Sequence, residues 1–178
     1  SENKSSPLPW VKSYRTYIQW LERQDKEEAM RYWERYLDSF EEYTGVPKTK
    51  ILNQNQNIYN NKKVSFQLSR EKTVGLNKLV VQNRVTLNTV TQVLWGILLG
   101  KYNGKGDVVF GAVVSGRPSD LEGVESIVGL FINTVPVRIR FQERMKFHEL
   151  LQRVQEDALA GEPYHYHPLA EIQAASAL

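Results

Sequence analysis

The apolar residues of the first forty positions recur with the spacing of amphipathic helices. Tyr14, Tyr17 and Leu21 occupy positions i, i+3 and i+7, and the same kind of spacing continues over residues 29–40. The pattern predicts two amphipathic helices at the start of the chain. Residues 43–61 are rich in Asn, Gln, Lys and Gly and have too little apolar surface to order themselves, so we expect a long flexible loop there.

The next segment changes from a period of two to a helical period. Val64, Phe66 and Leu68 alternate with polar residues, which predicts a half-buried strand, and Ser69 follows where a helix N-cap belongs. A helix should therefore begin after Ser69. Its inward residues are expected to be Leu76, Leu79 and Val80.

A second helix is predicted from near Asn88, and it is apolar most of the way round, so we expect it to be the buried helix. The apolar face predicted for it comprises Val90, Val93, Leu94, Ile97 and Leu98, with Trp95 and Leu99 on its flanks.

Two strands and two helices are predicted for the remainder of the chain. Residues 108–114 form an unbroken apolar run, which is typical of a strand covered on both faces at the centre of a sheet. Residues 135–141 alternate with polar positions that include Arg138, so that strand should have one wet face. An irregular segment, Ser115 to Asn133, connects the strands, and helices follow at residues 147–158 and after His167.

This order of elements predicts an α/β fold, a two-layer sandwich with helices packed on a small mixed sheet. Three strands make a thin sheet, so we expect further strands to come from outside these 178 residues. The absence of cysteine excludes disulfides, thiol nucleophiles and cysteine-ligated metals, and fits a reducing compartment. The longest apolar run is too short to span a bilayer and no signal-peptide core opens the chain, so we expect a cytoplasmic protein.

Charge is unevenly distributed, although the net charge is only +3. Residues 1–42 carry 7 basic and 9 acidic residues, residues 43–106 carry 10 and 1, and residues 107–178 carry 6 and 10, so the middle segment has a net charge of +9. We favour a solvated surface as the explanation over a docking face for an acidic partner. Nucleic acid ranks lower because no recognised motif accompanies the lysines.

Few residues offer catalytic chemistry. Of the three histidines, His148 is expected to face solvent, and His165 and His167 lack a third metal ligand, so we favour loop histidines with satisfied hydrogen bonds. Ser115 follows a strand but lacks the G-x-S-x-G pattern of a nucleophile elbow, which favours a turn. Arg117 is different, because a forked cation at the end of a buried strand needs a carboxylate or backbone acceptors.

Several motifs together resemble one family. Asp107 to Pro118 (DVVFGAVVSGRP) and Gly129 to Arg138 (GLFINTVPVR) resemble motifs in the carboxy-terminal lobe of nonribosomal peptide synthetase condensation domains. Tyr14 to Leu37 resembles the stretch between the two lobes of that family, and His167 to Gln173 resembles its last motif. The resemblance implies a chloramphenicol acetyltransferase-like lobe. It also implies the following division: an inter-lobe helical segment at 1–42, the flexible loop at 43–61, and a carboxy-terminal lobe at 62–178 that is incomplete at its end.

The resemblance implies a role in forming amide bonds between aminoacyl or peptidyl thioesters carried on phosphopantetheine arms. The family's catalytic motif, HHxxxDG, lies in the other lobe and is absent from this sequence, so no catalytic residue is expected in the chain and the fragment alone should be inactive. Arg117 would pair with the aspartate of that motif, and Asn133 would line the acceptor side of a tunnel. The residues implied to form the tunnel and its floor are Ser115, Gly116, Gly129, Leu130, Phe131 and Asn133.

The partners implied are the missing amino-terminal lobe, the donor and acceptor carrier proteins and a neighbouring adenylation domain. No directly bound cofactor, metal, nucleic acid or membrane is expected. The form of the last two motifs resembles domains that join an L-configured donor to an L-configured acceptor. The alternative is a non-catalytic module whose basic middle segment docks a carrier protein.

Overall fold

The computed structural model describes residues 10–40, 44–46 and 63–176. The chain divides into two compact units. The first comprises residues 1–42, 111–136 and 160–178, and the second comprises residues 43–110 and 137–159. The flexible loop predicted at 43–61 lies outside the described residues apart from positions 44–46.

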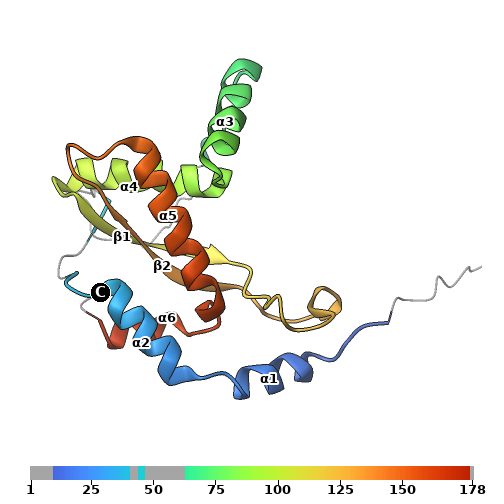
Figure 1. Cartoon of the computed structure of the whole chain (residues 1–178). Helices are drawn as coiled ribbons and strands as arrows, with labels where there is room; N and C mark the ends of the chain where they lie inside the picture. The colour runs from blue at the N-terminus through green and yellow to red at the C-terminus, as the bar shows by residue number, and fades with distance from the viewer. Residues whose placement is uncertain (1–9, 41–43, 47–62, 177–178) are drawn as a thin grey trace, which may run out of the picture. The chain divides into compact units, whose positions relative to one another are not determined.

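The first unit begins with the two predicted amphipathic helices, which are confirmed. Helix α1 spans Tyr14–Glu22 and α2 spans Lys26–Leu37 (Figure 1). Side chains cap both, because Ser13 accepts from a backbone N–H of the first turn of α1, and Asp25 does the same for α2.

Short helices complete the first unit. The 3-10 helices η1 and η2 span Val124–Ser126 and Glu162–Tyr164, and α6 spans Leu169–Ala174. Helix α6 lies against α2. The Trp33 indole donates to the carbonyl of Tyr164 at 3.4 Å and Ile172 is fully buried, so aromatic and aliphatic packing hold the end of the chain to α2.

In the part of the second unit that the structure describes, three helices surround one apolar core. Helix α3 spans Arg70–Asn83 with Ser69 as its N-cap, as predicted, α4 spans Leu87–Asn103, and most of α5 (Phe147–Gly161) belongs to this unit. The fully buried residues at the centre of the core are Val93, Val108, Ile139 and Leu151. Among the described residues, no helix has the length and apolar character needed to cross a bilayer.

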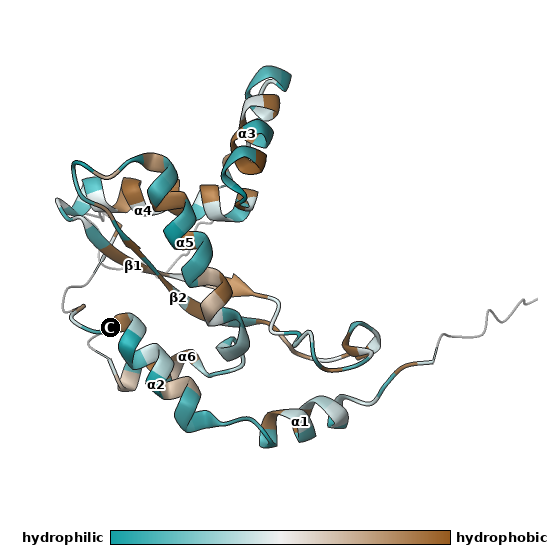
Figure 2. Ribbon diagram, viewed as in Figure 1, coloured by the Kyte–Doolittle hydropathy of each residue, from teal (hydrophilic) through white to brown (hydrophobic). Residues whose placement is uncertain are grey.

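Strands β1 (Asp107–Val114) and β2 (Asn133–Arg140) pair antiparallel and are brown over much of their length in Figure 2. The predicted layering of helices on a small sheet is confirmed, with two strands in the described residues. The strand predicted at residues 64–68 is wrong. Val64 and Phe66 are 87% and 82% exposed, and the segment pairs with no strand among the residues that the structure describes.

The predicted inner face of α4 is wrong in part. Val90 and Val93 are buried, but Leu94 and Leu98 are exposed, and Leu99 is buried instead. A Cβ atom on Gly96 would come within 2.4 Å of the Ile139 side chain, so this glycine lets the helix lie directly against β2. A helix that is apolar all round has no periodic signal for its inner face, and the close approach at Gly96 selects it.

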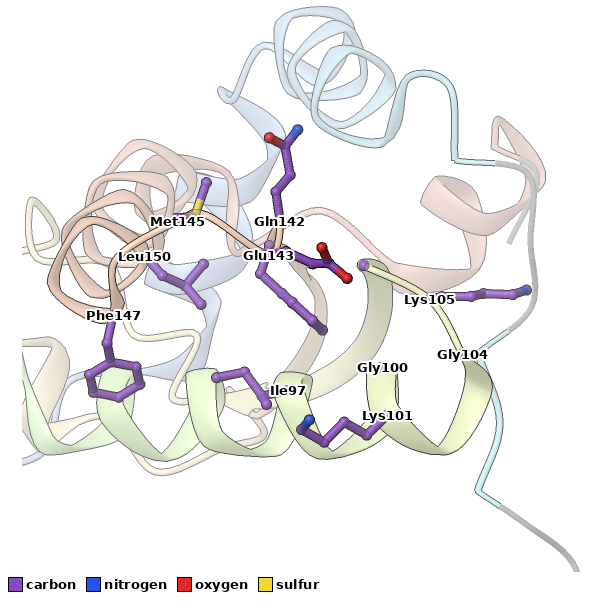
Figure 3. Close-up of a pocket in the computed structure, with 12 residues that line it drawn as sticks. Ile97, Gly100, Lys101, Gly104, Lys105, Gln142, Glu143, Met145, Phe147 and Leu150 are labelled. Atoms are coloured by element: carbon purple, nitrogen blue, oxygen red, sulfur yellow. The ribbon is translucent and has the colours of Figure 1, made fainter.

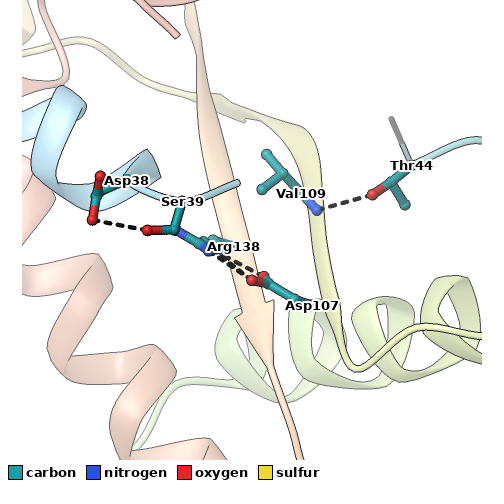
Figure 4. A network of polar contacts seen from close by, with 6 residues as sticks. All are labelled: Asp38, Ser39, Thr44, Asp107, Val109 and Arg138. Carbon is teal, nitrogen blue, oxygen red and sulfur yellow. Dashed lines mark hydrogen bonds and ion pairs between the residues drawn. The ribbon is translucent and has the colours of Figure 1, made fainter. Parts of the chain in front are cut away.

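Two expectations about the strands also need correction. Val113 is 72% exposed, so β1 is not covered on both faces along its length, since no further strand or helix lies over its end in the described residues. Arg138, predicted on a wet face, is 5% exposed. Its guanidinium donates from Nε and Nη2 to Asp107 at 2.9 and 2.6 Å, and this forked pairing makes burial of the charge tolerable (Figure 4).

Candidate functional site

The two motifs singled out in the sequence meet beside the ends of the paired strands. The SGRP motif follows β1, and the GLFIN segment leads into β2. At Gly116, φ is +62°, and a Cβ atom there would lie only 1.8 Å from the carbonyl oxygen of Phe131. Glycine is required at this position on both counts, because other residues disfavour the left-handed conformation and any side chain would collide with the opposite motif.

Arg117 organises the segment between the motifs. Its Nη1 atom donates to the carbonyl of Val124 and, at 3.1 Å, to that of Ile127, while the guanidinium carbon lies 4.1 Å from the centre of the Phe131 ring. The expected need for a definite partner is therefore confirmed, and backbone carbonyls meet it. The other edge of the guanidinium, Nε and Nη2, makes no hydrogen bond within the part of the chain that the structure describes.

An aromatic cluster from α1 supports this loop. Tyr17 is buried with its ring 4.5 Å from that of Phe131, and Val124 and Ile127 complete the same apolar cluster. Burial, together with neighbouring Tyr14, raises the pKa of the Tyr17 phenol, which keeps it neutral. The helical spacing of α1 predicted a buried face, but nothing in that spacing indicated that this face packs beneath the GLFIN segment.

Hydrogen bonds from α1 also hold the segment between the two motifs. The Tyr14 hydroxyl donates to the carbonyl of Leu130 at 2.6 Å, and the Trp20 indole donates to Asp120 at 3.0 Å. A Cβ atom on Gly129 would come within 2.1 Å of the Tyr14 ring, so the loop backbone lies against the aromatic ring. Sequence reasoning missed these residues of α1 because their partners lie about a hundred positions away along the chain.

Asn133 connects the loop to the end of the chain. Its amide Nδ2 donates to the carbonyls of His165 and His167, both at 2.8 Å, and its Oδ1 accepts from the backbone N–H of Thr134. Both N–H groups of the amide are therefore used in holding the segment that precedes α6. Leu130, by contrast, is 75% exposed.

The histidines differ from one another. His148 is exposed, as expected. His167 is 1% exposed, and neither of its ring nitrogens makes a hydrogen bond with any residue that the structure describes, so the expectation of a loop histidine with satisfied hydrogen bonds is wrong for this residue. The Glu171 carboxylate lies 3.4 Å from its Nε2 without hydrogen-bond geometry. Burial lowers the pKa of His167, and Glu171 offsets this only in part; burial also lowers the pKa of His165.

A pocket of about 540 Å³ lies elsewhere, in the second unit. It is formed by α4 and the segment between β2 and α5, and apolar side chains such as Ile97, Met145 and Leu150 line much of it (Figure 3). None of the residues predicted for the site borders it.

Within the described residues, no three His, Asp or Glu side chains are grouped closely enough to hold a metal ion. In the loop between the two motifs, the free edge of the Arg117 guanidinium can bind a carboxylate.

Comparison with known proteins agrees with this arrangement of motifs. The family model described as "Condensation domain" matches residues 1–178. Bacitracin synthase 3 from Bacillus licheniformis is 47% identical over 98% of the chain, and tyrocidine synthase 3 from Brevibacillus parabrevis is 44% identical over 98%. The chain spans only 3% of the length of each of these two proteins.

Solved structures show the same fold. The crystal structure of a four-domain nonribosomal peptide synthetase in its holo form, bound to AMP and glycine, superposes with a TM-score of 0.71 over 86% of this chain and 11% of that one, at 18% identity. This likeness extends the agreement from the motifs to the backbone. With a family model that matches its whole length and relatives that are nearly half identical, the chain belongs to the condensation domain family of nonribosomal peptide synthetases.

Proposed function

We propose that the chain provides the carboxy-terminal lobe of a condensation domain, which forms amide bonds between aminoacyl or peptidyl thioesters bound to carrier proteins. The proposal includes the division into an inter-lobe segment at 1–42, a loop at 43–61 and a lobe at 62–178. The observation that carries it is the loop organised by Arg117, in which the SGRP and GLFIN motifs are in direct backbone contact.

No residue of this chain would form a covalent bond with a substrate during the reaction. The amine of the acceptor attacks the carbonyl carbon of the donor thioester, the C–N bond forms, the C–S bond breaks, and the amine proton leaves as the donor thiol is released. A histidine of the HHxxxDG motif on the amino-terminal lobe would assist the proton transfer. Because that motif is absent from these 178 residues, we propose that the fragment is inactive without its amino-terminal partner.

Arg117 would act as a positioning residue. Its Nη1 is committed to the loop, and the remaining Nε and Nη2 edge has the geometry to bind a carboxylate through two parallel hydrogen bonds. We propose that this carboxylate is the aspartate of HHxxxDG. The guanidinium would then connect the loop behind SGRP to the motif that bears the catalytic histidine.

The remaining predicted residues would shape the tunnel. Gly116, Gly129 and Phe131 would form its floor together with Ser115 and Leu130, since the glycines allow the backbone segments to approach closely. Asn133 would act on the acceptor side by holding the segment at His165 and His167, because its amide N–H groups are already engaged there.

The test is amide-bond formation by the intact two-lobed domain supplied with loaded donor and acceptor carriers. Arg117→Ala is expected to slow condensation by about 100-fold, the usual consequence of displacing a reacting group by roughly 1 Å. Arg31→Ala, at an exposed position on α2, is the matched control and should keep wild-type activity. Wild-type rates for Arg117→Ala would refute the proposal.

A charge exchange separates positioning from simple folding. Arg117→Asp combined with replacement of the motif aspartate by arginine should recover part of the activity that either single change loses, because the ion pair is rebuilt in reverse. Thermal unfolding of each variant shows whether the domain remains folded. No recovery from a folded double variant would contradict the pairing.

The proposal also covers the configuration of the substrates, the partner proteins and the cellular location. We propose an L-configured donor and an L-configured acceptor, which a condensation assay with L- and D-aminoacyl donors would test. The partners would be donor and acceptor carrier proteins, whose phosphopantetheine arms carry the substrates, and a neighbouring adenylation domain. A cytoplasmic location belongs to the same proposal and fits a chain without cysteine.

A further inference from the structure

The start of the chain holds the loop between the two motifs at more than one point. In addition to the hydrogen bonds from Tyr14 and Trp20, the Lys12 ammonium donates to the carbonyl of Glu122 at 2.6 Å. The three partners lie at positions 120, 122 and 130, so the loop is held near both of its ends. The proposed reaction gives none of these three side chains a role.

Tyr14 contacts three successive residues of the GLFIN segment, and each contact is of a different kind. Its ring packs against the backbone of Gly129, and its hydroxyl donates to the carbonyl of Leu130 at 2.6 Å. The same ring meets that of Phe131 edge to face, with 5.6 Å between the ring centres. Ser13 caps α1 and thereby fixes the helical turn that carries Tyr14.

Backbone hydrogen bonds do not hold this part of the loop. Among the residues that the structure describes, positions 128–131 make no hydrogen bond from one backbone group to another. A segment without such bonds takes its position from the side chains packed against it. The hydrogen bond from Tyr14 to Leu130 therefore fixes a stretch of backbone that belongs to no strand, helix or turn.

Phe131 connects Tyr14 to Arg117. Its side chain is 5% exposed, and its ring contacts the Tyr14 ring and also has the guanidinium carbon 4.1 Å from its centre. Close-packed side chains transmit a displacement to their neighbours, so a shift of the backbone at Leu130 also moves the ring beneath the guanidinium. The direction of the Nε and Nη2 edge therefore depends on where Tyr14 holds the loop.

We propose that Tyr14 is a positioning residue for condensation, which acts through Phe131 on the guanidinium of Arg117. The hydroxyl sets the backbone at Leu130, the backbone sets the Phe131 ring, and the ring sets the direction of the guanidinium edge. The inference rests on the proposed function in one respect, because it takes this edge as the group that holds the catalytic motif of the other lobe. It gives the segment at 1–42 a part in the geometry of the reaction.

The primary test is steady-state condensation by the intact two-lobed domain with loaded donor and acceptor carriers. Tyr14→Phe removes the hydroxyl and keeps the ring, so kcat should fall about fivefold, the factor that corresponds to one hydrogen bond, while KM for the acceptor carrier stays unchanged. Tyr14→Ala also removes the ring and should approach the loss of about 100-fold expected for Arg117→Ala. A wild-type kcat for Tyr14→Phe would overturn the inference.

Tyr164→Phe is the matched control, because it removes a phenol that also joins two elements of the first unit. The Tyr164 hydroxyl donates to Glu28 at 2.9 Å and so connects η2 to α2 instead of reaching the loop. This variant should keep the wild-type kcat, and thermal unfolding should show that both variants remain folded. An equal loss of kcat in the two variants would mark a purely structural effect and would overturn the inference.

A rate cycle with Arg117 tests the route by which Tyr14 acts. In the Arg117→Ala background, Tyr14→Phe should change kcat by less than about twofold, because the guanidinium that it positions is gone. A purely structural role would lower kcat by the same factor in both backgrounds. That additive result would overturn the inference.

Amide hydrogen exchange distinguishes failure of this inference from failure of the proposed function. The N–H groups of Val124 and Ile127 bond to carbonyls within the loop, and their own carbonyls accept from Arg117, so Tyr14→Phe should speed their exchange in a folded domain. A wild-type rate for Arg117→Ala, with faster exchange in Tyr14→Phe, would refute the proposed role of Arg117 while the anchoring by Tyr14 stands. The expected loss for Arg117→Ala, with wild-type rate and exchange in Tyr14→Phe, would overturn the inference alone.

Discussion

Replacing Gly116 by alanine would test the backbone contact that brings the two motifs together. The added Cβ atom would be placed 1.8 Å from the carbonyl oxygen of Phe131 and 3.0 Å from its carbon. An oxygen in van der Waals contact with a methyl group lies well beyond 3 Å, so either the SGRP turn or the Phe131 peptide must move by more than about 1 Å.

Two costs add at this position. The left-handed conformation, at φ +62°, costs a residue with a side chain about 1–2 kcal/mol. Relief of the collision displaces Phe131, which is 5% exposed and packs between Arg117 and Tyr17, so part of an aromatic side chain's burial, about 1–3 kcal/mol, is also lost. We expect a destabilisation of about 2–5 kcal/mol, which places the variant at the severe end of single substitutions.

The assay combines urea unfolding with amide hydrogen exchange over residues 117–131. Gly75→Ala is the matched control, since nothing lies within 4 Å of its Cβ position and alanine in the middle of α3 should stabilise by about 0.5–1 kcal/mol. The same substitution is thus expected to act with opposite sign at two positions. A Gly116→Ala variant with wild-type exchange rates and an unchanged unfolding midpoint would refute the geometry.

Two predictions concern charge. Because burial lowers the pKa of His167, the folded state binds a proton at this residue less readily than the unfolded state does. The free energy of unfolding is therefore at its full value above about pH 6.5 and decreases as the pH falls below it. Urea midpoints measured from pH 7.5 to 5.5 should fall, and His167→Gln should flatten the slope; an equal slope in both proteins would contradict the assignment. Asp107→Asn leaves the buried Arg138 without its carboxylate and should cost about 1–3 kcal/mol by urea unfolding. Glu143→Gln removes a carboxylate at an exposed position after β2 and is its control, and equal midpoints for the two variants would contradict the role of the ion pair.

Local patterns were sufficient where each residue's environment comes from its own element. The helical spacing of α1 and α2, the cap at Ser69 and the irregular character of the segment after Ser115 follow from neighbours in the chain, and all are present in the structure. The need of Arg117 for a definite partner is of the same kind, since a guanidinium at a strand end requires acceptors in any fold.

The predictions from sequence that were wrong share a different cause. Residues 64–68 have the alternation of a strand, but a strand exists only when another strand pairs with it. Arg138 has the sequence position of a wet-face residue, yet Asp107 on the neighbouring strand allows it to be buried. In both cases the outcome depends on a residue or strand that local patterning does not specify.

By itself, the sequence determined the family, the order of the helices and the positions of the two motifs, because these depend on residue type and short-range spacing. Tertiary structure alone decided which face of α4 is buried, that Arg117 binds the carbonyls of Val124 and Ile127, and that Asn133 holds the segment before α6. The physical reason is that packing and hydrogen bonds join groups far apart in the chain, and their geometry exists only after the elements meet.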